Sequence, residues 1–251
     1  MKRLTLSVVV LACLACGGLP GGAPQVEAPA DAPKVPQLVD TPKVAILYFD
    51  YDGDDADLKS LKKGFAQMVI TDMAANEGFD VVERGRLEDI LKELDLNRSG
   101  HIDPDKAVEI GKLVGADLTV MGSYFEAMGS FRVDTRIVDT ATSVITCGVG
   151  ETGKREDFLG IQSRLADKLS VAVLSDGKDC TSPRPEKVPP KPAMQRKKIK
   201  KLEVATAATF SRALDAIDTG DTETAKTELA AVVKQEPDFK LAADELAGLM
   251  L

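Results

Sequence analysis

The chain has 251 residues and a formal net charge of -8, with 44% hydrophobic residues, 4% aromatic residues and no tryptophan. This composition is typical of one folded core with appended segments, and the chain is long enough to bury a sizeable core. The acidic excess argues against nucleic-acid binding, because phosphate contacts need lysine and arginine clustered on one face, with aromatic side chains for stacking.

The first 16 residues have the build of an export signal with a lipidation site. Lys2 and Arg3 precede an apolar run that is too short to span a bilayer. Cysteine follows small or apolar residues at Cys13 and at Cys16, a pattern that resembles the lipobox of bacterial lipoproteins. We favour Cys16, which allows the longer apolar region and precedes two glycines, whereas Cys13 has the better aliphatic residue, Val10, three positions before it.

These residues predict a lipid anchor on the periplasmic side of the outer membrane, since no Asp follows either cysteine as in the known signal for the inner membrane. The alternative is an ordinary cleaved signal that happens to contain cysteines. Export to an oxidising compartment would also allow Cys147 and Cys180 to form a disulfide. Two unpaired thiols are the equal alternative.

Two proline-rich segments divide the rest of the chain. Eleven of the thirteen prolines fall in residues 17–42 and 176–200, and such segments bury too little apolar surface to fold. We therefore predict two tethers, one before a domain at 43–175 and one before a helical segment at 201–251. The basic run QRKKIKK, at 195–201, is expected to be a solvated linker, with contact to anionic lipid as the alternative.

Strand-like and helix-like patterns alternate between the tethers. VAILYF at 44–49 is a continuous apolar run, which predicts a strand covered on both faces. Apolar residues at helical spacing predict a helix from Leu58 to about Gly78. The further predicted elements are a strand at 79–84, helices at 87–94 and 103–115, antiparallel strands at 117–125, 131–140 and 143–149, and a helix at 155–174. This order predicts an α/β fold, a mixed sheet with covering helices.

The helical segment resembles a tetratricopeptide repeat. Small residues, a turn glycine and a late proline fall at that family's spacing in residues 210–239. Only one repeat is present, with 240–251 as a third helix. A solitary helix pair buries too little surface to be stable alone, so we expect it to pack against another part of the protein.

Residues 95–106, DLNRSGHIDPDK, resemble the calcium loop of an EF-hand. Oxygen-bearing side chains alternate as that loop requires, and Gly100 stands at the sixth position. The twelfth residue is Lys106, whose ammonium stands where a bidentate glutamate is needed. We therefore expect a plain connection between helices, in which Gly100 turns the chain and Asp103 caps the next helix.

Two other segments have the spacing of ligand sites. GVGETGK at 148–154 matches a nucleotide-binding loop, but Arg155 replaces the Ser or Thr that holds magnesium and too few strands follow, so we expect a strand end and a polar turn. The acidic loop at 50–57 follows the first strand, where α/β proteins often bind ligands. We expect a solvated loop leading into a helix N-terminus, with a weak cation or hydroxyl-ligand site as the alternative.

His101 is the only histidine, and no nucleophile or second metal ligand accompanies it in a recognised catalytic pattern. No nucleophile elbow or zinc-helix motif is present. The sequence therefore predicts a protein that is not an enzyme and that uses no metal and no cofactor.

Four segments together resemble the curli assembly/transport lipoprotein family, usually called CsgG: residues 44–53, 64–93, 100–124 and 132–140. The most telling pieces are Val82-Glu83-Arg84 and the series that runs from Ser99 to Ser123. The resemblance covers about residues 43–173. It implies an α/β domain akin to the N-terminal domain of the TolB protein, a lipid anchor, and work in the periplasm at the outer membrane.

One departure limits what the resemblance implies. Members that build the curli pore carry long amphipathic hairpins, and a membrane-spanning strand needs about nine to eleven residues. Only 126–130 and 140–143 join the late strands here, so we do not carry the pore role over. We predict an assembly or interaction module whose partners are other envelope proteins or copies of itself. The alternatives are a periplasmic ligand-binding or sensory module and a component of a curli-like secretion channel.

Overall fold

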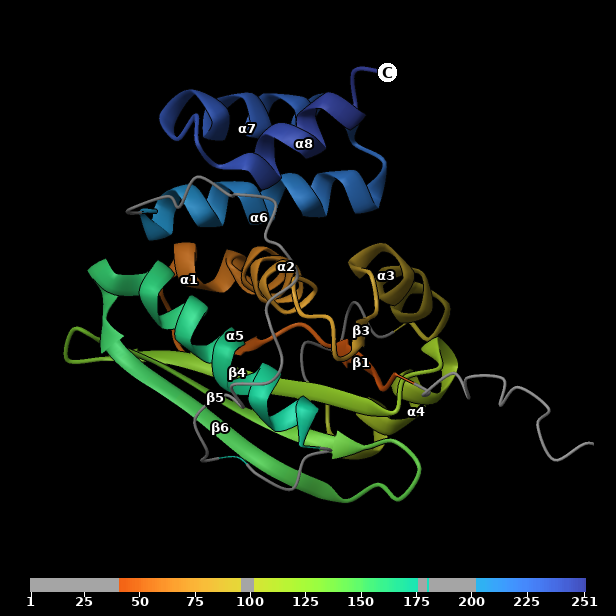
Figure 1. Cartoon of the computed structure of the whole chain (residues 1–251). Coiled ribbons are helices and arrows are strands. Elements are labelled where there is room, and N and C mark those ends of the chain that lie inside the picture. Colours follow the sequence, from red (N-terminus) through yellow and green to blue (C-terminus); the bar gives the residue numbers. More distant parts are fainter. Residues whose placement is uncertain (1–40, 96–101, 176–179, 181–201) are drawn as a thin grey trace, which may run out of the picture. The chain divides into compact units, whose positions relative to one another are not determined.

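The computed structural model describes residues 41–95, 102–175, 180 and 202–251 (Figure 1). Within these residues the strands form one six-stranded sheet in the order β3-β1-β4-β5-β6, and β2 pairs with β4 beside this path. The strands are β1 (Lys43–Ile46), β2 (Asp50–Tyr51), β3 (Asp80–Val81), β4 (Leu118–Ala127), β5 (Ser130–Asp139) and β6 (Ile145–Lys154).

The helices lie between and after these strands in the chain. They are α1 (Ala56–Ser60), α2 (Lys62–Met73), α3 (Arg84–Glu93), α4 (Pro104–Val114), α5 (Phe158–Leu174), α6 (Val204–Thr219), α7 (Thr222–Gln235) and α8 (Lys240–Gly248). A 3₁₀ turn at Arg155–Asp157 leads into α5.

The sheet is mixed, as the sequence predicts. β1 runs parallel to β3 and to β4, whereas β4, β5 and β6 are antiparallel neighbours. The β4–β5 hairpin closes through Met128 and Gly129, both with positive φ (52° and 74°), as the tight turns of hairpins require. The β5–β6 connection is also short, and Ser143 takes a positive φ of 62° in it.

Some element bounds differ from the sequence prediction. The predicted helix from Leu58 is split, because the backbone N–H of Leu61 bonds to the carbonyl of Leu58 in a tighter turn that ends α1 before α2 begins. The strand predicted at 79–84 is only two residues long. The last strand instead continues beyond its predicted end to Lys154, because it pairs with β5 along nearly its whole length.

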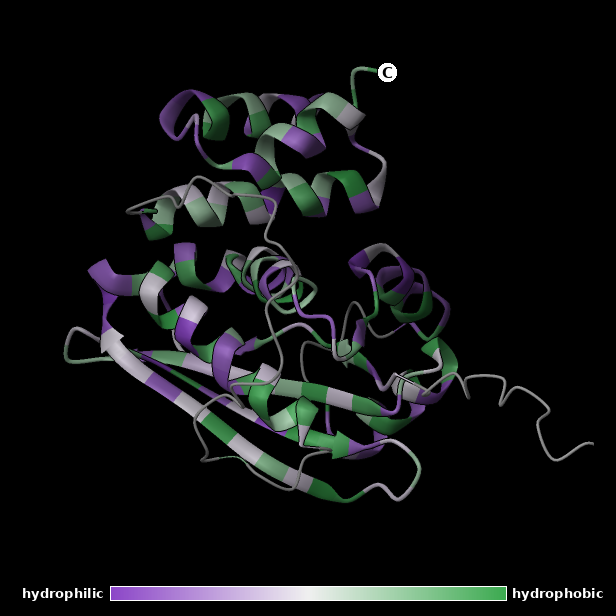
Figure 2. Cartoon of the chain, viewed as in Figure 1, coloured by the Kyte–Doolittle hydropathy of each residue, from purple (hydrophilic) through white to green (hydrophobic). Residues whose placement is uncertain are grey.

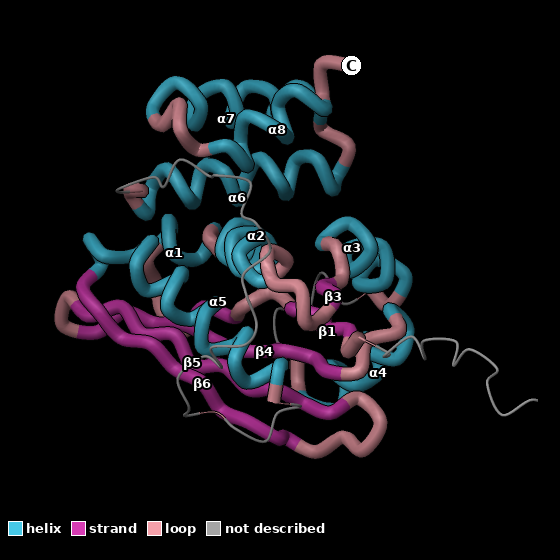
Figure 3. Tube along the Cα trace, viewed as in Figure 1, coloured by secondary structure: helices cyan, strands magenta, loops and turns pink. Residues whose placement is uncertain are grey.

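Both faces of β1 are buried, which explains its continuous apolar run. Val44 and Ile46 belong to the core that α2 and α5 cover, and Ala45 and Leu47 belong to a second core formed with α3 and α4. Figure 3 shows α5 running across one face of the long strands. The first core continues beyond α2 into α6, α7 and α8, whereas the second core contains no residue of β5 or β6.

The C-terminal helices pack on α2 through α6 (Figure 1). The backbone N–H of Gly64 donates to Ser211 Oγ at 2.9 Å, and a Cβ atom at Gly64 would lie 2.9 Å from Ser211 Cβ and 3.2 Å from the Ala207 carbonyl oxygen. The two helices therefore cross closely at a glycine. The expectation that the helical segment packs against another part of the protein is confirmed.

Helices α6, α7 and α8 also pack against one another, as a continuation of the first core. The rings of Phe210 and Phe239 meet edge to face with centroids 5.0 Å apart, and Ala225, Leu229 and Val232 of α7 are fully buried. The outer surface of α7 is largely hydrophilic (Figure 2). These helices therefore form a compact layer with one side on α2 and the other in solvent.

The close helix crossing yields a matched pair of predictions. Gly64→Ala is expected to destabilise the protein by about 1–3 kcal/mol, because its methyl group has no space against α6. Gly85→Ala, in α3, has nothing within 4 Å of the new methyl group and is expected to stabilise by about 0.5–1 kcal/mol. Urea unfolding of both variants measures the two effects, and equal effects would contradict the close crossing.

Candidate interaction surface

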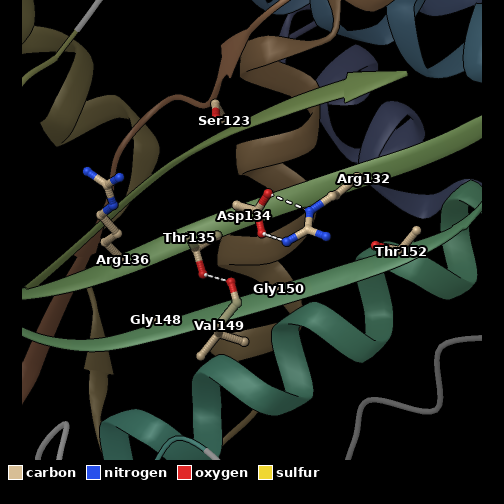
Figure 4. Close-up of a pocket in the computed structure, with 9 residues that line it drawn as sticks. All are labelled: Ser123, Arg132, Asp134, Thr135, Arg136, Gly148, Val149, Gly150 and Thr152. Carbon is tan, nitrogen blue, oxygen red and sulfur yellow. Dashed lines mark hydrogen bonds and ion pairs between the residues drawn. The ribbon is translucent and has the colours of Figure 1, made fainter. Parts of the chain in front are cut away.

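The outward side of β4, β5 and β6 is an open face of the sheet. We call it the outer sheet face; it has a shallow hollow along its middle (Figure 4). Pairing across the three strands sets its residues in rows, with Asp134 between Ser123 and Gly150. Its residues are Ser123, Arg132, Asp134, Arg136, Gly148, Gly150 and Thr152.

Three charged residues form a line along β5 on this face. Arg132 donates from Nε and Nη2 to the two carboxylate oxygens of Asp134, at 2.7 Å and 2.8 Å. The pair is about half exposed, so it contributes little to stability. In Figure 4, Arg136 extends away from this pair. The face therefore presents one neutralised charge pair and one arginine whose donors point outward.

Two glycines leave the β6 side of this face without protruding side chains. Gly148 pairs with Arg136 and Gly150 pairs with Asp134. A Cβ atom at Gly150 would lie 2.8 Å from a carboxylate oxygen of Asp134, so the glycine leaves room for that side chain. Glycine inside a strand is typical of places where another backbone approaches closely.

The opposite side of β6 is held by α5. Lys168 Nζ lies 2.7 Å from Glu151 and donates to the carbonyl of Gly150 at 3.0 Å, and Arg164 lies 3.3 Å from Glu151. Burial of Glu151 opposes its ionisation, but the hydrogen bonds from Lys168 and Arg164 outweigh this effect and hold its pKa below the usual value. These contacts hold β6 on the side that α5 covers and leave its other face open.

A second polar site lies where α2, α3 and α6 meet. Asp218 of α6 is 6% exposed and receives hydrogen bonds from Arg84 Nη1 at 2.6 Å and from Lys63 Nζ at 2.8 Å. Lys92 Nζ donates to the backbone carbonyl of Asp218 at 2.7 Å. We call these four residues the Asp218 cluster.

Contacts with carboxylates keep Arg84 and Lys63 of this cluster charged. Burial alone would lower the pKa of Arg84 and of Lys63, but the carboxylate of Asp218 outweighs it and holds both pKa values above their usual range. For Lys63, Asp215 contributes as well, at 2.7 Å. Both cations stay charged at neutral pH. The buried side chain of Asp218 therefore has two cationic partners.

A cleft of about 350 Å³ opens beside this cluster, at the carboxyl end of β1. Tyr48 donates its hydroxyl to Glu88 at 2.6 Å, and burial, together with this bond, raises the pKa of Tyr48. Helices α1, α2, α3 and α6 supply most of the other lining residues: Lys59, Ser60, Lys62, Lys63, Leu91, Lys92, Asp215 and Thr219. Asp50 of β2 and Ile102, two residues before α4, complete the lining.

The acidic loop at 50–57 has a structural role. Asp55 accepts a hydrogen bond from the Leu58 backbone N–H and caps α1, and its other oxygen lies 3.0 Å from Arg155. Arg155 also lies 2.7 Å from Glu126 at the end of β4. The bond from Leu58 and the bond from Arg155 both lower the pKa of Asp55. The loop is therefore tied to the sheet as well as leading into a helix.

The two other motif-like segments also serve the fold. Asp103 accepts a hydrogen bond from the Lys106 backbone N–H and caps α4, as predicted, whereas residues 96–101, including His101 and Gly100, lie outside the described residues. The segment 148–154 is not a loop and does not turn, because it is the extended second half of β6. The predicted polar turn at this place is therefore wrong, and a phosphate-binding loop has no place here.

Cys147 and Cys180 are joined in the structure as a disulfide, with their Cα atoms 5.8 Å apart. That distance lies within the range that disulfides use. The bond connects β6 to the chain that follows α5. Pairing in the exported protein remains a prediction, and both lipidation candidates, Cys13 and Cys16, lie outside the described residues.

Neither a metal-ligand group nor a membrane-spanning helix is present among the described residues. No group of three His, Cys, Asp or Glu side chains there could hold a metal ion. None of the helices there is long and apolar enough to cross a membrane.

The Asp218 cluster is the feature that the sequence analysis missed. Its signal was present, because Asp218 follows Ser211 and Leu214 at spacings of seven and four residues and so shares the buried stripe of α6. A carboxylate on an apolar stripe predicts a cationic partner. Which cation it meets depends on how α6 crosses α2 and α3, and helical spacing carries no information on that.

Residues 27–127 match the sequence model of the family described as "Curli production assembly/transport component CsgG". This match confirms the resemblance over that part of the chain, which contains β1 to β4. The family's description concerns assembly and transport in curli production. No curated protein matches the sequence.

Several solved structures are similar to parts of the chain. The LpoB C-terminal domain from Salmonella enterica has 14% identity and a TM-score of 0.38, over 45% of this chain and 83% of that one. Lipoprotein GNA1162 from Neisseria meningitidis has 13% identity and a TM-score of 0.37, over 53% and 94%. TolB from Acinetobacter baumannii has 14% identity and a TM-score of 0.33, over 53% and 27%.

Loss of the disulfide is expected to destabilise the protein. Cys147 and Cys180 are 33 positions apart, and closing a loop of that length is worth about 3–4 kcal/mol in the chain-entropy account. Cys147→Ala with Cys180→Ala should lower the free energy of unfolding by roughly that amount. Mass spectrometry of unreduced peptides from exported protein checks the bond, and two free thiols would contradict it.

Proposed function

We propose that the chain is a non-enzymatic lipoprotein, anchored at the periplasmic side of the outer membrane, that takes part in assembling or docking other envelope proteins. The observation that carries the proposal is the outer sheet face: an open surface with an exposed arginine on β5, next to β4, the last strand within the residues that match the CsgG family. The family match supports the coarser role in the envelope. The lipobox-like cysteines support the anchor.

The partner surface that fits the outer sheet face is acidic. Arg136 offers planar donors that match a carboxylate, and Arg132 could exchange its exposed bond to Asp134 for a carboxylate of a partner at little cost. Gly148 and Gly150 allow a partner backbone to approach β6 without side chains between them. The proposed mode is therefore protein contact through charge and backbone.

Charge reversal on this face tests the role. Arg132→Glu with Arg136→Glu should lower the capture of partners by tagged full-length lipoprotein at least about tenfold, because like charges across an interface cost several kcal/mol. Arg212→Glu is the matched control, since Arg212 is also exposed, at 42%, but lies on α6. Equal capture by both variants, with unchanged melting temperatures, would exclude this face.

The anchor is tested separately. Mass spectrometry of the mature N-terminus should find a diacylglycerol on Cys16, and Cys16→Ser should release the chain from membranes. Lipid on Cys13 would move the anchor by three residues. Finding no lipid on either cysteine would contradict the anchor and leave the surface test untouched.

A ligand-binding role is the second candidate, and the cleft at β1 favours it. The chain connects β1 to β3 on one side and then passes to β4 on the other side of β1, and open α/β sheets bind ligands at such points. Calorimetry with calcium, nucleotides and cell-wall fragments distinguishes the two roles. Heat of binding that is lost in Lys59→Glu would favour the ligand role.

A further inference from the structure

The cleft beside the Asp218 cluster lies where helices from both faces of the sheet meet. Helix α2 belongs to the first core and α3 to the second core, and both line the cleft past the carboxyl end of β1. Strand β1 has β3 on one side and β4 on the other. Open α/β sheets bind ligands in crevices at such places. The fold therefore puts this concave site where ligands of α/β proteins are found.

The size of the cleft suits a small molecule. Its volume of about 350 Å³ lies near the lower end of the range for small-molecule sites. Leu91 and Ile102 supply apolar lining, and α6 supplies Asp215 and Thr219, so the C-terminal helices complete one wall. The cleft is therefore shaped for a compact polar ligand with a few carbon atoms, and it is too small for a folded partner.

Each carboxylate that lines the cleft already has a cation of the protein beside it. Glu88 Oε1 lies 3.4 Å from Lys63 Nζ, and Asp215 lies 2.7 Å from the same nitrogen. Asp50 lies 3.4 Å from Lys62 Nζ. A cationic ligand would have to compete with these ion pairs. The lining therefore favours an anion.

Two lysines of the lining have no such carboxylate. Lys59 and Lys92 are exposed residues in the last turns of α1 and α3. Among the residues that the structure describes, Lys59 Nζ has no carboxylate within ion-pair distance. Lys92 Nζ donates to an uncharged group, the backbone carbonyl of Asp218. Two ammonium groups of the lining are therefore available to an anionic ligand.

We infer that the cleft binds a small molecule through a phosphate monoester group, with Lys59 and Lys92 as its cationic partners. Such a group carries about 1.5 to 2 negative charges at neutral pH, which matches two ammonium groups. A carboxylate carries one charge and pairs best with the planar donors of arginine, whereas lysine binds phosphate as a point charge. The nearby arginine, Arg84, is engaged with Asp218.

This inference rests on the ligand role that is the second candidate function, and it names the class of ligand. It does not depend on the outer sheet face or on the lipid anchor. A soluble phosphate ester and a lipid headgroup share the chemistry that the cleft recognises.

Calorimetry of the full-length protein in non-ionic detergent tests the inference. Glycerol 3-phosphate should bind, and it should bind more tightly than glycerate, which keeps a three-carbon skeleton but carries a carboxylate. Lys59→Gln and Lys92→Gln should each weaken this binding about tenfold, because each removes a hydrogen bond between charged groups. Dihexanoyl phosphatidic acid, a short-chain lipid, distinguishes the two sources: binding of this lipid favours a headgroup, and binding of the soluble ester alone favours a free ester.

Lys234→Gln is the matched control. Lys234 is also an exposed lysine in the last turn of a helix, α7, and it does not line the cleft. This variant changes the net charge by the same amount and should bind glycerol 3-phosphate as the unchanged protein does. Lys59 makes no side-chain contact that a change to glutamine would break, so its variant should keep the melting temperature even if Lys92→Gln loosens α6.

Three results would overturn the inference. Equal weakening in Lys59→Gln and Lys234→Gln would mean general attraction to positive charge. Binding of glycerate or of an uncharged cell-wall fragment, without binding of either phosphate compound, would remove the phosphate class and leave the ligand role standing. No heat with any of these compounds would remove both, while the capture test of the outer sheet face would be unaffected.

Discussion

The burial of one carboxylate between two cations sets the position of the C-terminal helices. Asp218 is 6% exposed and Arg84 is 8% exposed, so neither charge can be satisfied by water. A buried charge without a partner costs several kcal/mol, and a hydrogen-bonded counter-ion offsets part of that cost. Helix α6 must therefore lie where Asp218 reaches Arg84 and Lys63, and α7 and α8 follow it.

The two sides of the sheet differ as a result: one is covered by helices and the other is partly open. Helices α2 and α5 cover one side of the sheet, and α6 in turn covers α2, so apolar surface on that side is buried. The far side of β5 and β6 keeps arginine, aspartate and glycine facing outward. Helix α5 holds β6 on the covered side, through the contact between Lys168 and Glu151.

The sequence predicted the fold class, the buried strand, the order of the elements and the caps at Asp103 and Gly115, because these depend on local pattern. It placed the end of β6 wrongly, because GETGK has the residues of a turn and only pairing with β5 keeps it extended. The outer sheet face and the Asp218 cluster were missed for the same reason. Arg132 and Arg136 alternate with buried residues in any β-strand, and only the positions of the helices decide which face stays open.

A double-mutant cycle between Arg84 and Asp218 tests the central claim most directly. Arg84→Met and Asp218→Leu should each lower the free energy of unfolding by about 3–5 kcal/mol, because each removes one partner of a buried ion pair. The double variant should lose far less than the sum of the two, since residues in direct contact couple by about 0.5–3 kcal/mol or more when charges are buried. Simple addition of the two losses in urea unfolding would contradict the claim that this pair holds α6 in place.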